Sequence, residues 1–248
     1  MCVAAIYDIH GNLPALEAVL HDIHHAEVDS VVVGGDVVPG PMPRETLAHL
    51  LELDIPVQFI QGNGEVAVLA QMAGADPGSL PEQAREAVDW TAEQLTADHM
   101  RLLASWPKTV SLEIDGLGEV LFCHATPRNE NECFTRLTSE DRLLPIFQGL
   151  QAALVICGHT HMQFERTVGR IHVVNAGSVG MPFGEPGADW LMLGPSVQLR
   201  HTAYDLGKAA ERIGDTTYPH AHEFATRYVL RPPSEGEMLE IFAKVELS

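Results

Sequence analysis

The chain has 248 residues, of which 46% are hydrophobic, and its formal net charge is −19 at pH 7. This length is sufficient for one large domain with a sizeable core. The acidic balance disfavours nucleic acid and anionic membranes as partners. Because the chain contains no run of about 18 apolar residues, we expect no membrane span.

The N-terminal stretch and the cysteines bear on the compartment. The first residues, MCVAAIYDIHGN, have no basic leader and reach a charged residue at Asp8, so they do not read as a signal peptide. The cysteines form no CxxC pair and lie at Cys2, Cys123, Cys133 and Cys157. Two of them fall within apolar runs, where small buried thiols are common. We therefore expect a reduced, cytoplasmic protein, for which a homodimer would be an ordinary state.

Six short apolar runs, rich in valine and isoleucine, recur along the first 175 residues. They lie at 2–7, 30–33, 56–60, 119–123, 153–157 and 171–174. Continuous runs of this length are typical of strands that are covered on both faces. Helical patterns lie between them, at 13–23 with Asn12 as the cap, at 43–53 and at 81–105. This alternation predicts an α/β fold.

The pattern changes after about residue 189. The stretches DWLMLG and VQLRHTAYD indicate two more strands, which we expect to be antiparallel. Helices are expected near 205–213, 219–230 and 234–246. The sequence thus predicts a single domain over 1–248, with a helical excursion near 65–107 and a helical C-terminal segment near 205–248. Residues 62–80 are expected to form a long surface excursion.

Each of the six apolar runs ends in polar residues or a glycine-flanked turn. In open α/β sheets the carboxyl ends of the strands form the ligand crevice, so these side chains are expected to converge on one rim. Seven of them can bind a metal ion: Asp8, His10, Asp36, Asn63, His124, His159 and His161.

The chemistry of this set indicates a catalytic centre. It offers carboxylate, amide and imidazole donors without a thiolate, which suits Mn, Fe, Zn or Ni better than a structural zinc site. Seven donors are too many for one catalytic ion and about right for two ions that share a carboxylate. Two ions roughly 3.5–4 Å apart are the usual arrangement for displacement at phosphorus.

The order of the motifs resembles the calcineurin-like metallophosphoesterases, in particular their small bacterial and archaeal phosphodiesterase branch. The family motifs D-x-H, G-D, G-N-H-D/E, H and G-H-x-H appear here as DIHGN, GGD, GNGE, CHATP and GHTH. The resemblance implies a four-layer α/β/β/α sandwich of two mixed sheets flanked by helices, with the metal site at the C-terminal ends of the strands. It also implies a phosphoesterase that hydrolyses small phosphodiesters, nucleotides or aryl phosphates.

The resemblance further assigns roles to the seven residues. Asp8, His10 and His161 would hold the first ion, Asp36 would bridge, and a second ion would be held by Asn63, His124 and His159. A hydroxide between the two ions would be the nucleophile. We assign Asp36, Asn63 and His124 as catalytic residues.

Three further residues are candidates for substrate binding: Asn12, Arg44 and Arg128. The two arginines follow the Asp36 and His124 motifs, and their planar donor forks suit a phosphate. A surface salt bridge is an equally good explanation for each arginine. The walls of the pocket are expected to come from the loops after Asp36, Asn63, His124 and Asn175.

One motif departs from the family. Many relatives have histidine after the asparagine of G-N, where it can protonate the leaving oxygen, whereas this chain has Gly64 followed by Glu65. General acid catalysis typically contributes about 10²–10⁴-fold, so the rate is expected to depend steeply on leaving-group pKa. A Gly64→His substitution is expected to give a modest rescue, and Glu65 is one alternative acid.

Two other functions fit parts of this pattern. A non-catalytic member could use the same fold to bind a protein or a nucleotide, but such members usually lose metal ligands, and all seven are present. A metallo-β-lactamase-like hydrolase requires H-x-H-x-D-H, whereas MQF follows HTH here. The sequence therefore favours a phosphoesterase.

Overall fold

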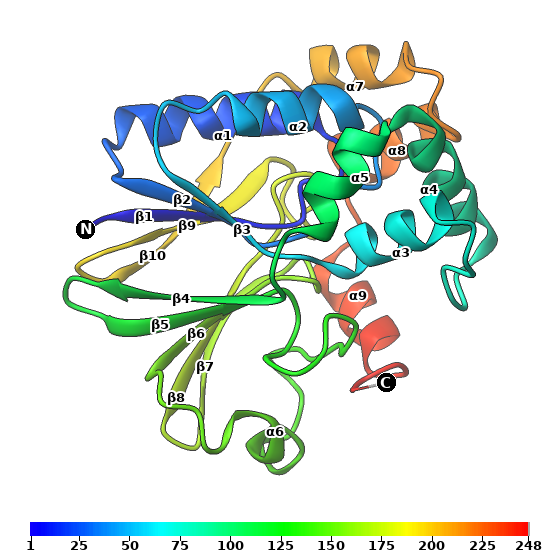
Figure 1. Cartoon of the computed structure of the whole chain (residues 1–248). Helices are drawn as coiled ribbons and strands as arrows, with labels where there is room; N and C mark the ends of the chain where they lie inside the picture. Colours follow the sequence, from blue (N-terminus) through cyan, green and yellow to red (C-terminus); the bar gives the residue numbers. More distant parts are fainter. Residues whose placement is uncertain (248) are drawn as a thin grey trace.

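Strand β1 (Val3–Ile6) shows why the molecule is layered, because its four side chains are all buried. Val3 and Ala5 belong to one apolar cluster, and Ala4 and Ile6 belong to another. Side chains alternate between the two faces of a strand, so a strand that is buried throughout must be covered on both sides. A second sheet covers one face and helices cover the other (Figure 1).

The computed structural model, which describes residues 1–247, places ten strands in two five-stranded mixed sheets. The first sheet has the order β10 (Val197–Thr202), β9 (Ala188–Leu193), β1, β2 (Ser30–Val33) and β3 (Val57–Phe59). The second has the order β4 (Thr109–Ile114), β5 (Gly118–Cys123), β6 (Leu154–Cys157), β8 (Ile171–Ala176) and β7 (Gln163–Val168). Strands β1, β2 and β3 run parallel, as do β5, β6 and β8, and the other pairs are antiparallel.

Helices cover the outer faces of both sheets (Figure 1). Above the first sheet lie α1 (Leu13–His25), α2 (Pro43–Leu51) and α7 (Leu206–Gly214), and below the second lies α6 (Glu140–Phe147). Their apolar faces pack into clusters with the sheets beside them. The expected four-layer α/β/β/α sandwich is confirmed.

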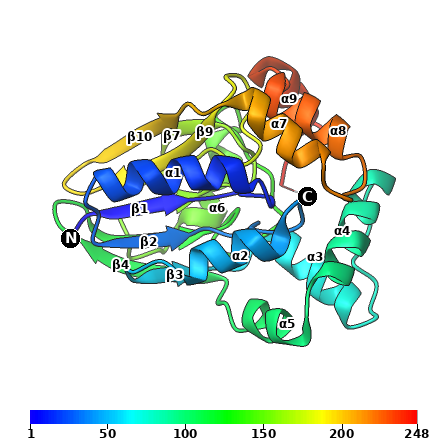
Figure 2. The same ribbon diagram turned by 90° about the horizontal axis from the view of Figure 1, so that it is seen from above.

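Two further groups of helices lie together at the end of the sheets toward which β1 and β2 point (Figure 2). One group consists of α3 (Asn63–Met72), α4 (Glu82–Gln94) and α5 (Ala97–Ala104). The other consists of α8 (Ala221–Phe224), a π-helical segment (Ala225–Leu230) and α9 (Glu235–Phe242). The first group contacts the segment that leads into α8, where the rings of Trp90 and Tyr218 meet edge to face with centroids 5.2 Å apart. Across residues 1–247, no helix has both the length and the apolar character to cross a bilayer.

Several elements differ from the sequence-based expectation for identifiable reasons. Strands β4 and β7 were not predicted because they are edge strands with polar, partly exposed positions. Helix α6 was missed because Pro145 lies inside it. The expected helix over 81–105 is two helices, since Thr96 caps the start of α5. The expected surface excursion at 62–80 begins instead with α3, whose Val68 is fully buried.

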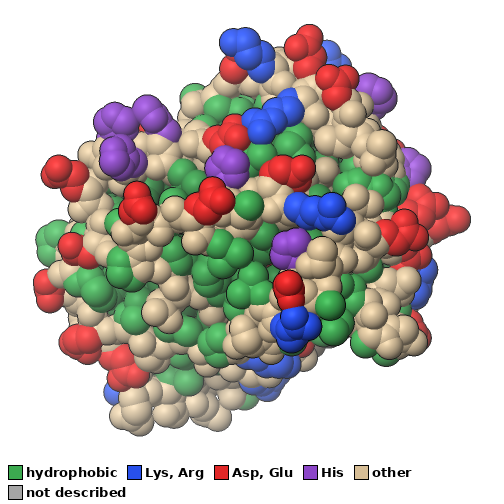
Figure 3. All heavy atoms as spheres, turned by 45° about the horizontal axis from the view of Figure 1, so that its top comes forward, with side chains coloured by type: hydrophobic (Ala, Val, Ile, Leu, Met, Phe, Trp, Pro, Cys, Tyr) green, Lys and Arg blue, Asp and Glu red, His purple; other side chains and the backbone are tan. Residues whose placement is uncertain are grey.

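On the face drawn in Figure 3, lysine and arginine side chains lie among acidic ones and form no continuous basic patch. Nucleic acids are bound largely through clustered basic residues that contact phosphates. This face therefore offers no such surface.

Candidate metal centre

The candidate ligands follow the ends of strands that run in the same direction. Asp8 and His10 come after β1, and Asp36 comes after β2. Asn63 begins α3 just beyond β3, His124 follows β5, and the GHTH segment follows β6. Parallel strands end at the same edge of each sheet, and the packing of the two sheets against each other brings the ligands of both sheets to one place.

The backbone at these positions is unusual. Five of the eight non-glycine residues with positive φ in the described chain are candidate ligands: Asp8, His10, Asp36, His159 and His161. Their φ angles lie between 47° and 67°, in the left-handed region that L-residues seldom adopt. Such strain persists only where the surroundings enforce it, and it is concentrated at functional sites.

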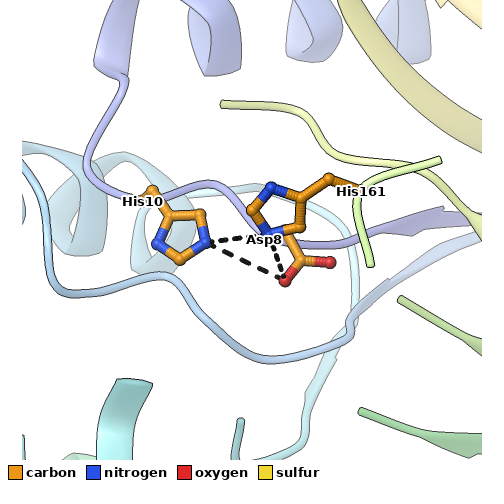
Figure 4. A group of neighbouring side chains, drawn as sticks. All are labelled: Asp8, His10 and His161. Atoms are coloured by element: carbon orange, nitrogen blue, oxygen red, sulfur yellow. Dashed lines mark hydrogen bonds and ion pairs between the residues drawn. The ribbon is translucent and has the colours of Figure 1, made fainter. Parts of the chain in front are cut away.

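The first group of donors consists of Asp8, His10 and His161 (Figure 4). The Nε2 atoms of the two imidazoles lie 3.2 Å apart. Asp8 Oδ1 is 3.3 Å from Nε2 of His161 and 3.9 Å from Nε2 of His10. Three donors from two segments about 150 residues apart in sequence therefore face one point.

The second group consists of Asp8, Asp36 and His124. Asp36 Oδ1 lies 3.6 Å from His124 Nε2, and Asn63 Oδ1 lies 2.9 Å from the same nitrogen. His159 lies beside them, with its ring centroid 5.1 Å from that of His124. Asp8 is common to both groups, and Asp36 also reaches the first group, with its Oδ2 atom 3.7 Å from His10 Nε2. Both carboxylates thus lie between the two sets of imidazoles.

Backbone carbonyls orient the imidazoles. Nδ1 of His124 lies 2.9 Å from the carbonyl oxygen of Gly34, and Nδ1 of His161 lies 3.0 Å from that of Met181. A carbonyl can only accept, so each Nδ1 must carry the proton, and the lone pair is left on Nε2. Hydrogen bonds of this kind fix the tautomer of metal-binding histidines.

The buried donors fit a divalent cation. Asp8 Oδ1 is buried and has no hydrogen-bond partner, although three Nε2 atoms lie within 3.9 Å of it. Burial, together with the nearby imidazoles, lowers the pKa of His10 and of His159 to about 3, so both rings are neutral and able to coordinate. Burial and the negative charge of Asp8 raise the pKa of Asp36. A cation would relieve this repulsion and would complete the coordination of Asp8.

Comparison with known proteins bears on this arrangement. A family model described as the calcineurin-like phosphoesterase superfamily domain matches residues 1–193. The chain belongs to that superfamily. The uncharacterized protein MJ0912 of Methanocaldococcus jannaschii is 27% identical over 237 residues, which are 88% of this chain and 93% of the relative.

Solved structures show the same calcineurin-like fold. The hypothetical protein PH1004 of Pyrococcus horikoshii OT3 has a TM-score of 0.78 at 20% identity, covering 94% of this chain and 99% of its own. A metallophosphoesterase from Sphaerobacter thermophilus has a TM-score of 0.69 at 26% identity, covering 92% of this chain and 98% of its own. Membership places the chain among the phosphoesterases.

Gly64, where many calcineurin-like relatives have histidine, lies against the loop that carries Asp36. Its backbone N–H donates to Asp36 Oδ1 at 2.6 Å. A Cβ atom at Gly64 would lie 2.2 Å from the carbonyl oxygen of Val38 and 2.9 Å from Cδ of Pro39. No side chain fits there unless the loop moves. This crowding argues against the expectation that Gly64→His would give a modest rescue.

We predict that Gly64→Ala and Gly64→His both lower activity and stability. Overpacking of this kind typically costs about 1–3 kcal/mol, and displacement of the loop would also misplace Asp36. Thermal unfolding and hydrolysis of bis(p-nitrophenyl) phosphate measure the two effects. Gly236→Ala in α9 is the matched control, because a Cβ atom there meets nothing within 4 Å. Equal or higher activity in Gly64→His would contradict this prediction. It would show that the loop can move to admit the histidine and that proton donation by the new side chain outweighs the displacement of Asp36.

Glu65 has a role that the sequence did not reveal. Its carboxylate is fully buried and accepts from the backbone N–H groups of Asp36 and Gly62, both at 2.8 Å, and of Val38 at 3.1 Å. Burial and the charge of Asp36 raise its pKa to about 7. Glu65 thus clamps the Asp36 loop onto the start of α3. It is not placed to protonate a leaving group.

Cys133 is a second residue that the sequence did not point to. Its Sγ atom lies 3.2 Å from Nε2 of His159, and burial raises the pKa of its thiol to about 11. Asn175, which was expected only at the rim, instead supports the GHTH segment, since its Nδ2 donates to the carbonyl oxygen of Gly158 at 2.6 Å. Cys133 belongs to no recognisable motif.

Asn12, a candidate for substrate binding, lies within the fold instead. It is fully buried. Its Nδ2 donates to the carbonyl oxygen of Gly180 at 2.8 Å, and its Oδ1 accepts from the N–H of Ala15 at 3.3 Å. Both ends of the amide therefore hold the beginning of α1 against the loop after β8, and no part of it is exposed to a substrate.

The two candidate arginines are engaged with other parts of the protein. Nε of Arg44 donates to the carbonyl oxygen of Gln94 at the end of α4. The guanidinium of Arg128 forms a forked ion pair with Glu132, with Nε 2.9 Å from Oε1. Arg128 also lines a hollow of about 20 Å³ that His124 borders. Of the two, only Arg128 therefore lies beside a candidate ligand.

Proposed function

We propose that the protein is a dinuclear metal-dependent phosphoesterase that hydrolyses small phosphodiesters, nucleotides or aryl phosphates. One observation carries the proposal: a buried carboxylate oxygen of Asp8 has no hydrogen-bond partner and faces the Nε2 atoms of three histidines. An uncompensated buried charge is costly, and the residues around it are donors that suit Mn, Fe, Zn or Ni. Membership of the calcineurin-like superfamily supports the same reaction class.

The residues of the chain would act mainly by positioning and by charge. Asp8, His10 and His161 would hold one ion, and Asn63, His124 and His159 would hold the other. The Asp36 carboxylate would lie between the two sets of ligands. When bound, the two ions would supply positive charge for the phosphoryl oxygens and would lower the pKa of water. Asp8 and Asp36 offset part of that charge, and the fixed Nδ1 hydrogen bonds hold the imidazoles in place throughout.

Hydrolysis forms a bond between water oxygen and phosphorus and breaks the bond from phosphorus to the alcohol, which leaves with one proton from that water. Gly64 offers no side chain to deliver this proton. Proton delivery by a positioned acid typically contributes about 10²–10⁴-fold. Esters of acidic alcohols, such as nitrophenols, are therefore the best first substrates.

We predict that chelation removes the activity and that metal restores it. The purified protein is assayed with bis(p-nitrophenyl) phosphate before and after EDTA treatment, and then with Mn, Fe, Zn or Ni added back. Elemental analysis of the same samples should give close to two metal ions per chain. Activity that is indifferent to EDTA, in protein that contains no metal, would contradict the proposal. Chelator-sensitive nucleotide binding without turnover would favour a non-catalytic member of the family.

A further inference from the structure

A groove of about 380 Å³ opens beside the metal centre. One end is formed by His10, Asp36 and Asn63, so the groove is continuous with the candidate ligands. The rest is mainly apolar, and its walls include Leu80, Ala84, Val88, Met181, Phe224 and Tyr228. About half of the lining comes from α3, α4 and the C-terminal helices, and the loops expected after Asp36 and Asn175 contribute Pro39 and Met181.

The charge of the groove restricts what it can bind. No lysine or arginine occurs among the described residues that line it. The only charged side chains in the lining beyond the metal centre are His220, when protonated, and the acidic Glu223. A second phosphate placed along the groove would meet apolar surface and a carboxylate, and burying a charge without a partner is unfavourable.

Three polar side chains that line the groove, Gln83, His220 and Glu223, already have partners within the protein. Gln83 Nε2 donates to Glu223 Oε2 at 3.3 Å. His220 Nε2 lies 2.7 Å from Glu86 Oε2. These contacts join α4 to the segment around α8. A nucleobase is recognised by hydrogen bonds to its edges, and these side chains already use their polar atoms to bind each other or Glu86. The groove therefore favours an occupant without hydrogen-bonding edges.

Residues 218–228 form the C-terminal wall of the groove, and contacts between aromatic rings stabilise it. The rings of Tyr218 and Phe224 lie 5.8 Å apart, and those of Phe224 and Tyr228 lie 5.4 Å apart. Tyr218 also packs against Trp90 of α4. Ring pairs at such distances are favourable, so this wall is built in advance of binding. Pockets of about 300–1,000 Å³ are usual for small organic ligands, and the groove falls within that range.

We propose that the groove binds the organic part of the substrate and that this part is an uncharged aryl or branched aliphatic group. The enzyme would then act on esters with a single phosphate and an apolar alcohol, in preference to nucleotides and polyphosphates. This inference rests on the proposed function and narrows its substrate class. In this arrangement the phosphate lies at the candidate metal ligands, and the hydrocarbon lies between α4 and residues 218–228.

The test uses 1-naphthol, which has the shape of the organic part and no phosphate. Calorimetry with the EDTA-treated full chain measures binding to the groove without metal or catalysis. Ala84→Trp should fill the groove and weaken naphthol binding about 10-fold or more, as expected for loss of an apolar site of this size. Glu93→Trp is the control, because it adds the same ring at an exposed position on the same helix. Leu80→Ser, which lies outside the helices, should weaken binding about 3-fold by the same reasoning.

The metal-loaded protein provides the second measurement. For 1-naphthyl phosphate, Ala84→Trp should raise KM by about 10-fold with little change in kcat, since the groove contributes binding alone. AMP and ADP should compete poorly with 1-naphthyl phosphate. Absence of naphthol binding, equal effects of Ala84→Trp and Glu93→Trp, or strong competition by AMP would overturn the inference. Chelator-sensitive hydrolysis would persist in that case, whereas failure of the proposed function would abolish hydrolysis and leave naphthol binding intact.

Discussion

Replacing Asp8 with asparagine should reduce hydrolysis of bis(p-nitrophenyl) phosphate by about 10²–10³-fold and make the metal-free protein more stable. The carboxylate is shared by both groups of donors, so its loss weakens both metal sites. Without metal, the same carboxylate is buried, has an unpartnered oxygen and raises the pKa of Asp36, although against its burial the imidazoles of His161 and His124 hold the pKa of Asp8 itself below its usual range. An amide keeps the bond from the His159 N–H and removes the charge repulsion, a gain on the order of 1–3 kcal/mol.

The opposite signs of the two effects make this prediction specific to a metal site. Elemental analysis gives metal content, and urea unfolding in EDTA gives the free energy of unfolding. Asp22→Asn is the matched control, since its carboxylate accepts from Thr202 Oγ1 at 2.6 Å and belongs to neither donor group. That variant should keep its metal and its activity. If Asp8→Asn lost stability in EDTA and kept full activity, the carboxylate would be structural.

The sequence was informative about the ligands because each of them is tied to a strand that is easy to recognise. Buried parallel strands appear as continuous apolar runs, and the polar residue after each run marks the point where the strand leaves the core. Asp8 after β1 and Asp36 after β2 are examples. Neighbouring parallel strands fix the relative positions of their ends within each sheet, whereas the meeting of the two sheets was implied only by the family resemblance.

The groove and the support of the Asp36 loop could not be predicted in this way. The groove is formed where α4 meets residues 218–228, and nothing local in either segment specifies that contact. Gly64 and Glu65 read as a departure from the family motif, whereas the structure shows a glycine pressed against Val38 and a carboxylate that binds three backbone amides. Those roles depend on a loop that lies about 28 residues earlier in the chain.

Glu65→Ala is expected to produce the largest loss of stability among the single substitutions considered. It would leave the buried N–H groups of Asp36, Val38 and Gly62 without an acceptor. An unsatisfied buried group costs about 1–3 kcal/mol, so the free energy of unfolding should fall by about 3–9 kcal/mol with three such groups. Urea unfolding of the metal-free chain measures this loss, with Glu93→Ala at an exposed position of α4 as the control.

Glu65→Gln separates the structural role of this residue from any role as a proton donor. The glutamine oxygen can still accept from Asp36 and Gly62, while its amide group would face the N–H of Val38. We therefore expect an intermediate loss of stability and weaker metal binding, because the Asp36 loop is held less firmly. The dependence of the rate on leaving-group pKa should not change. A slope that steepened in Glu65→Gln would contradict the positioning role and would identify Glu65 as the acid, since only a lost proton donor penalises poor leaving groups selectively.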